Sequence, residues 1–308
     1  FQNVNMFSIS KLYAWFFFCE KYVIIPLGDY METIHNQFIK INDKLKNDIA
    51  IIIEAFINFY GEKNQEYIVN KLKNSKIIWY SDDKNIDVDD IHNYIISSIS
   101  KEELEELLKK RSKIAFLQSA YIDELDVLVL PLSYDLNHII HEMNHKIGSH
   151  ILSKEPLIQI SGLSYSIERA GMVLDMDYYF NEIINEKMTL EILAEMDLLG
   201  IKVSKTSSWQ ENLFPLIELF YEYFKDILKE TFISGNLVKL VNLLGKENYE
   251  ELSQFILLKR MKITKALKKG ETPEILPTDI EKAENIVKRM KVNYENITQV
   301  QIQEERKK

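Results

Sequence analysis

Apolar residues recur every three or four positions over most of the chain, which is the spacing of amphipathic helices. The pattern is clearest from Met31 to Tyr60, and Gly61 follows as a residue suited to ending a helix. The same spacing predicts helices at about residues 64–74, 88–98, 100–110, 135–149, 177–199, 211–233, 237–244, 249–267 and 278–290. The charged tail from Gln301 to Lys308 is expected to fray.

Short apolar runs interrupt the helical spacing in the first half of the chain. Residues 76–80, 114–117 and 127–132 predict strands, and Pro131 indicates that the last of these runs at a sheet edge or ends there. Pro156–Ile167 is expected to be extended, with a turn at Gly171. The pattern as a whole predicts an α+β fold that is predominantly helical.

Composition narrows the class of protein further. The 308 residues include nine glycines and six prolines, too few for a turn-rich all-β sandwich. A single cysteine, Cys19, excludes an internal disulfide framework and a cysteine-based zinc finger. The net charge of −9 argues against nucleic acid or an anionic membrane surface as the main partner.

The most apolar stretch of the chain is Tyr13–Cys19, which Glu20 and Lys21 follow directly. It is too short for a membrane span, which needs about 20 apolar residues. No membrane span is therefore expected. The lone cysteine favours a cytoplasmic location, although a trimmed export signal would leave no trace.

Four of the six histidines lie between positions 138 and 150, on a predicted helix that Ser133 or Asp135 could cap. Within this run, His141-Glu142-x-x-His145 places two imidazoles four residues apart, on one helix face. Two imidazoles at this spacing can bind one Zn²⁺. Glu142 is about 100° around the helix from His141, where it could accept a proton from a zinc-activated water.

A catalytic zinc site needs a third protein ligand. One candidate is local: Gly148 fits the metzincin pattern, but that pattern needs a histidine at position 151, where this chain has Ile151. His150 comes one residue early, and on a continuous helix it would face away from His141. A break at Gly148 would be needed to bring His150 to the metal.

The second candidate lies on the helix predicted at 177–199. Glu182 and Glu186 are four residues apart and share one face of a helix that is otherwise largely apolar. Buried carboxylates need partners. The zinc ion would be a partner for Glu182, and a zinc-bound histidine would be one for Glu186.

The two motifs together resemble the gluzincins, metallopeptidases with the thermolysin-like arrangement, whose pattern is H-E-x-x-H followed by N-E-x-x-x-D on a second helix. The matching residues are His141, Glu142, His145, Asn181 and Glu182. Glu186 stands where the family usually has Asp, in the role of a hydrogen-bond partner for a ligand. The resemblance covers about residues 125–200.

The resemblance implies a zincin-like catalytic core with a small sheet and an active-site helix. We expect this core at 113–200, between a mainly helical N-terminal region at 1–112 and a helical C-terminal region at 201–308. It also implies a zinc-dependent peptidase that hydrolyses a peptide or protein substrate.

In the implied mechanism, Glu142 accepts a proton from the zinc-activated water and returns it to the leaving amine. The tetrahedral intermediate needs a further donor. Candidates between the two motifs are Tyr165, Arg169, Tyr178 and Tyr179. Tyr165 is favoured because it lies in the extended segment, and His138 is expected to support a ligand or line the cleft.

Two other functions compete with this one. The chain could be a metal-binding regulatory or catalytically restricted protein that keeps a zincin-like site but acts through a protein partner. It could also be a helical interaction protein in which the motif is a coincidence. Metal analysis separates the last hypothesis from the first two.

Overall fold

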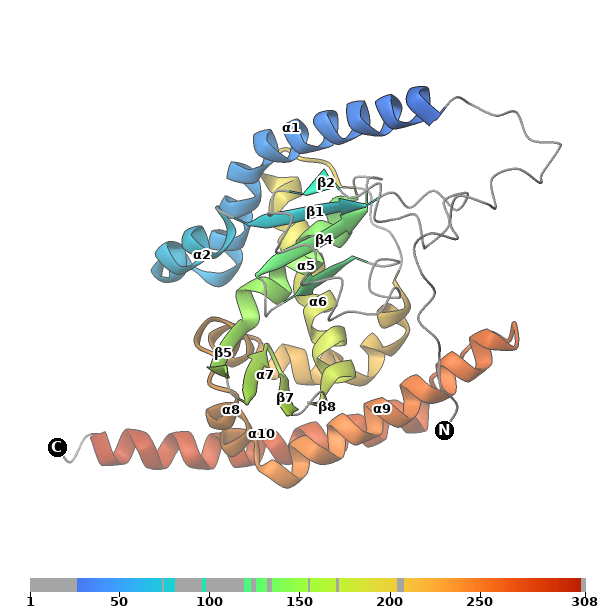
Figure 1. The fold of residues 1–308 in the computed structure, drawn as a ribbon. Coiled ribbons are helices and arrows are strands. Elements are labelled where there is room, and N and C mark those ends of the chain that lie inside the picture. The colour runs from blue at the N-terminus through green and yellow to red at the C-terminus, as the bar shows by residue number, and fades with distance from the viewer. Residues whose placement is uncertain are drawn as a thin grey trace.

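The computed structural model describes residues 27–73, 75–80, 96–97, 119–122, 126–131, 135–154, 156–169, 172–203 and 208–305 (Figure 1). Several sequence predictions lie outside these residues: the apolar run at 13–19, the helix at 100–110, the strand at 114–117 and the turn at 171.

Helices make up most of the described chain, which confirms the predominantly helical α+β class. They are α1 (Leu27–Tyr60), α2 (Gln65–Leu72), α5 (Leu136–Gly148), α6 (Tyr178–Leu198), α7 (Phe214–Ser234), α8 (Leu237–Leu244), α9 (Lys246–Lys268) and α10 (Pro277–Glu305), with short 3₁₀ helices η2 (Glu62–Asn64) and η6 (Trp209–Leu213). The prediction of a frayed tail is wrong as far as Glu305, because α10 remains helical to that residue. Its first part packs against α7, α8 and α9, and its last turns are rich in Gln and Glu, which favour helix.

The first sheet has the strand order β2-β1-β4-β3. Its strands are β1 (Lys76–Tyr80), β2 (Ile96–Ser97), β3 (Ala120–Ile122) and β4 (Val127–Pro131). β1 and β4 are parallel, and β2 and β3 pair antiparallel to them. β4 is an inner strand, so the prediction that Pro131 lies in an edge strand is wrong. The alternative prediction, that the strand ends at Pro131, is confirmed, because Pro131 is its last residue. The prediction of a helix at 88–98 is also wrong at Ile96–Ser97, because these two residues form a strand that pairs with β1.

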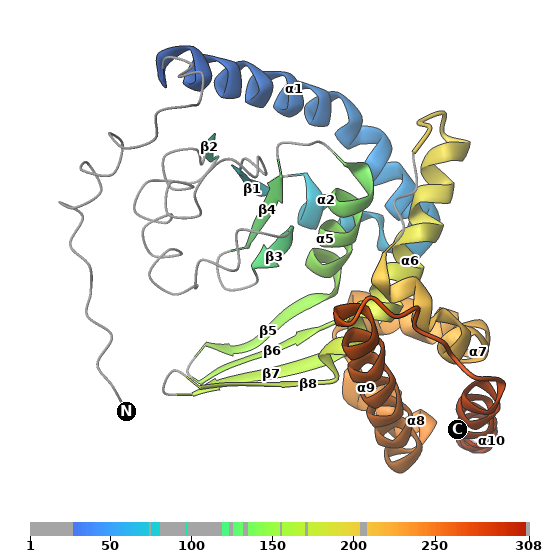
Figure 2. The ribbon, with the colours of Figure 1, turned by 90° about the vertical axis from the view of Figure 1, so that its right-hand side faces the viewer.

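The second sheet is antiparallel and lies between α5 and α6 in the sequence. It has the order β5-β6-β7-β8, with strands β5 (Ser149–Lys154), β6 (Leu157–Ser161), β7 (Ser164–Arg169) and β8 (Met172–Met176). Figure 2 shows its hairpins extending away from the helices. The predicted extended segment is confirmed as β6 and β7, whereas β5 and β8 were not predicted.

A single hydrophobic cluster runs through the described structure. It joins side chains from α1, α5, α6, α7 and α10, for example Ile52, Ile140, Ile184, Phe220 and Met290. α5 and α6 pack directly against each other within this cluster. None of the described helices is both long enough and apolar enough to cross a membrane. The domain boundaries at 112/113 and 200/201 remain predictions.

Candidate metal centre

The helix that carries the histidines is fixed at its N-terminus by Asp135. Its side chain accepts a hydrogen bond from the backbone N–H of Asn137 at 2.9 Å, which confirms it as the cap. Apolar side chains such as Ile139, Ile140 and Met143 are fully buried, so they hold α5 inside the core. The same burial places His141 and Glu142 in the interior.

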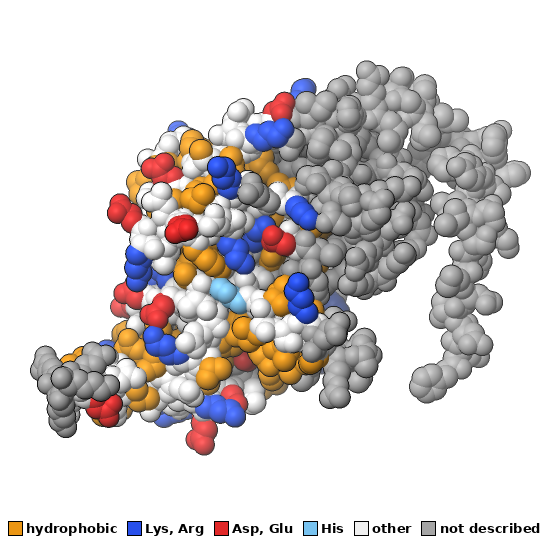
Figure 3. All heavy atoms as spheres, turned by 60° about the vertical axis from the view of Figure 1, so that its left-hand side comes forward, with side chains coloured by type: hydrophobic (Ala, Val, Ile, Leu, Met, Phe, Trp, Pro, Cys, Tyr) orange, Lys and Arg blue, Asp and Glu red, His pale blue; other side chains and the backbone are white. Residues whose placement is uncertain are grey.

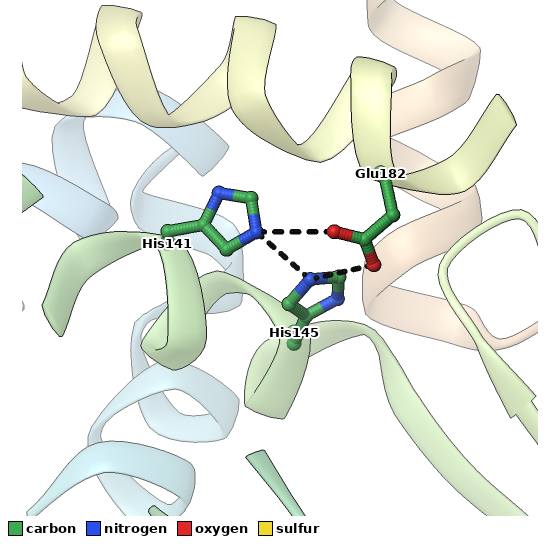
Figure 4. Close-up of side chains that lie close together, drawn as sticks. All are labelled: His141, His145 and Glu182. Atoms are coloured by element: carbon green, nitrogen blue, oxygen red, sulfur yellow. Dashed lines mark hydrogen bonds and ion pairs between the residues drawn. The ribbon is translucent and has the colours of Figure 1, made fainter. Parts of the chain in front are cut away.

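His141, His145 and Glu182 converge between α5 and α6 (Figure 4). The two Nε2 atoms are 3.1 Å apart. Glu182 Oε2 lies 3.4 Å from Nε2 of His141, and its Oε1 lies 3.2 Å from Nε2 of His145. Corners of a tetrahedral zinc site with ligand distances near 2.0–2.1 Å are separated by about 3.3 Å. The three side chains form a cluster that can hold a metal ion.

Glu186 is hydrogen-bonded to Nδ1 of His141, the ring nitrogen that does not face the other two ligands. Its Oε2 accepts a hydrogen bond from Nδ1 of His141 at 2.6 Å, and its side chain is buried. This bond orients the ring so that Nε2 is directed toward His145 and Glu182, the orientation that is usual for metal-bound histidines. A glutamate therefore fills the place that the resemblance assigns to an aspartate.

The charges around the cluster favour a bound cation. Glu142, Glu182 and Glu186 are 6%, 8% and 3% exposed, so three carboxylates are buried together. Burying carboxylates without compensating charge is costly. Lys146 is also buried on α5, but its ammonium group is paired with Asp126 at 2.7 Å and not with these carboxylates. A divalent ion would balance two of the three negative charges.

The pKa values of the ligands follow from this crowding. Burial by itself would lower the pKa of His141, but hydrogen bonds to Glu182 and Glu186 and the charge of Glu142 raise it well above its usual range. Burial would raise the pKa of Glu182, but the charge of His145 and hydrogen bonds from both histidines hold it well below its usual range. The carboxylates that favour a metal ion at this cluster therefore also favour a proton on His141.

Glu142 lies beside the cluster without belonging to it. It follows His141 directly on α5, and its carboxylate acts electrostatically on His141 and on His138. Among the described residues no hydrogen bond to this carboxylate is found. Within the described part of the chain, its oxygens are therefore available to a molecule bound at the site.

Two predicted residues contact other parts of the molecule. Asn181 Oδ1 accepts a hydrogen bond from the backbone N–H of Leu163 at 2.8 Å, so it anchors the turn between β6 and β7 to α6. Gly162 has φ +59° in this turn, and a Cβ there would lie 2.4 Å from Asn181 Oδ1. His138 is half exposed and pairs with Asp135 at 3.0 Å, a hydrogen bond that raises its pKa.

The alternative ligand His150 is directed away from the cluster. Helix α5 ends at Gly148 and the chain continues as β5, where Nε2 of His150 donates to the carbonyl of Phe232 at 2.8 Å. Tyr165 lies on β7, half-buried and packed against the core, and within the described residues it forms no hydrogen bond with the cluster. Its role as transition-state donor remains a prediction.

Three buried polar residues behind the ligands were missed from the sequence. The Tyr60 hydroxyl donates to Oδ1 of Asn144 at 2.6 Å, and Nδ2 of Asn144 donates to Oδ1 of Asn185 at 2.8 Å. Nδ2 of Asn185 donates to the backbone carbonyl of His141 at 3.1 Å. The sequence did contain one indication of the two asparagines: each lies within a ligand motif, on a helix that is otherwise largely apolar.

No protein-family model, curated protein or solved structure matches this chain. The His-His-Glu cluster therefore defines a candidate metal-binding protein on its own geometry. On the face shown in Figure 3, acidic and basic side chains of the described residues alternate among apolar ones, without a continuous basic area.

Proposed function

We propose that the chain is a zinc-dependent metallopeptidase of the gluzincin type. The observation that carries the proposal is the convergence of His141, His145 and Glu182 at tetrahedral spacing, with the buried carboxylate of Glu142 beside them. Two imidazoles and one carboxylate are a typical ligand set of catalytic zinc, which keeps a fourth position open. The hydrogen bond from His141 to Glu186 adds the partner that such ligands usually have.

Each residue has a defined task in the proposed reaction. When bound, the zinc ion lowers the pKa of a coordinated water to about 7 and polarises the scissile carbonyl. Glu142 removes a proton from the attacking water and returns it to the leaving amine. Glu186 keeps the His141 ring in place while the charges at the site change.

The first sheet offers a place for an extended substrate. Within the part of the chain that the structure describes, β3 is the terminal strand of its sheet and packs against α5. An extended peptide can add to a terminal strand through backbone hydrogen bonds. We therefore place the substrate chain along β3, next to the helix that carries Glu142.

The proposal is tested by measuring zinc content and peptide cleavage together. Chain purified without chelator is expected to contain one zinc per molecule and to cleave members of a mixed peptide library, followed by mass spectrometry. A chelator should stop cleavage, and added Zn²⁺ should restore it. Absence of stoichiometric zinc would contradict every metal-based function. Zinc without cleavage of any peptide would favour the alternative, a metal-binding regulatory protein that acts through a partner.

Zinc affinity is expected to fall as the pH is lowered from 8 to 6. The raised pKa of His141 means that the metal-free site holds a proton there, which zinc must displace. One competing proton changes the apparent affinity by up to about tenfold per pH unit below that pKa. Calorimetry in buffers with different ionisation enthalpies measures the proton released. A constant affinity with no proton release would contradict this description of the site.

A further inference from the structure

Two asparagines next to the ligands form a further polar contact between α5 and α6, in addition to the contacts of the histidines with Glu182 and Glu186. Asn144 and Asn185 are fully buried, and Nδ2 of the first donates to Oδ1 of the second at 2.8 Å. Asn144 immediately precedes His145, and Asn185 immediately precedes Glu186. The amide pair therefore lies level with the ligands on both helices.

The link continues on both sides. Tyr60, the last residue of α1, donates its hydroxyl to Oδ1 of Asn144 at 2.6 Å. On the other side, Nδ2 of Asn185 donates to the backbone carbonyl of His141 at 3.1 Å. Three helices are thus connected to the backbone of one ligand by consecutive hydrogen bonds.

A buried amide pair is sensitive to how two helices are aligned. Sliding α5 along α6 by one residue, about 1.5 Å, would separate the amides and leave buried polar groups without partners. Purely apolar contacts tolerate such shifts better, and single buried asparagines are known to fix helix register. Metal ligands, in contrast, must be placed within a few tenths of an ångström.

We propose that Tyr60, Asn144 and Asn185 are positioning residues that set the alignment of α5 and α6 at which His141, His145 and Glu182 meet at metal-binding distance. The inference rests on the proposed metal site and adds to it a role for residues that touch neither metal nor substrate. Their effect is exerted through the backbone of His141 and through the spacing of the two helices.

The test uses Co²⁺, whose absorption spectrum reports the number and geometry of its ligands. Asn185→Ala is expected to weaken Co²⁺ binding about 10–100-fold, the usual effect of losing a group that supports a ligand. Its visible spectrum should also shift from that of the wild type. Tyr60→Phe removes one hydroxyl at the far end of the link and should weaken binding severalfold.

Tyr249→Phe is the matched control. This buried tyrosine donates to the carbonyl of Leu163 and not to the asparagine pair. It should lower the melting temperature as Tyr60→Phe does, while leaving the Co²⁺ spectrum and affinity unchanged.

Three outcomes would count against the inference. A folded Asn185→Ala chain with the wild-type spectrum and affinity would overturn it. If that variant fails to fold, an unchanged spectrum and affinity in Tyr60→Phe would overturn it instead. Failure of the wild type to bind Co²⁺ at all would reject the metal site itself, and this inference with it.

Discussion

The Glu142→Gln variant is expected to bind one zinc ion per chain and to lose peptide hydrolysis by about 10²–10⁴-fold in kcat/KM, the usual contribution of a general base. The amide has nearly the shape of the carboxylate but cannot accept the proton of the attacking water. Glu142 does not belong to the ligand cluster, so the variant should still bind zinc, with an affinity lowered only by the loss of one neighbouring negative charge. Zinc content and cleavage of a fluorogenic peptide, measured on the same sample, provide the test.

The matching control is Glu247→Gln, the same substitution at an exposed position in the first turn of α9. This variant should retain wild-type activity and zinc content. Full hydrolysis by a zinc-loaded Glu142→Gln chain would show that another group accepts the proton. Loss of zinc in this variant would instead make Glu142 a ligand, contrary to the geometry.

Removing one ligand should cost the chain most of its affinity for zinc. Zinc binding by four ligands is worth about 10–16 kcal/mol, so each ligand contributes roughly 3 kcal/mol, or about 10²-fold in Kd. Glu182→Gln and His145→Gln are both expected to show this loss, measured by competition with a chromogenic chelator. Hydrolysis should fall with it, because Glu142 then has no activated water to deprotonate.

His150→Gln is the discriminating control, because His150 is the rival third ligand. Its Nε2 is bound to the carbonyl of Phe232, and its ring stacks on Tyr67. The substitution should therefore lower the melting temperature but leave the zinc affinity unchanged. Zinc lost in His150→Gln and retained in Glu182→Gln would reverse the assignment of the third ligand.

The helices, and the residues that share one helix face, were predicted well from the sequence, because both depend on residues close together in the chain. Spacing of apolar residues located α1, α5, α6 and α8 to within a few residues, because each of these helices buries one or more apolar faces. It also placed His141 and His145 on one face of a single helix, since four residues complete about one turn. The spacing of Glu182 and Glu186 on their helix was predicted for the same reason.

Pairing between distant segments was much less predictable. The edge position of Pro131 and the helix over Ile96–Ser97 were wrong, because strand order depends on partners far away in the sequence. β5 was missed because the helical spacing of the histidine run gave little indication that the chain becomes extended after Gly148. That change of backbone direction is what removes His150 from the site.

By itself the sequence determined the donor atoms, their order along two helices and the acid excess that a cation can balance. Tertiary structure decided which donors meet: it brought Glu182 within 3.4 Å of His141, paired Glu186 with the outer nitrogen of that ring, and turned His150 toward Phe232. The reason is physical. Spacing within a helix follows from its backbone hydrogen bonds, whereas the distance between two helices depends on the packing and buried polar contacts of the whole core.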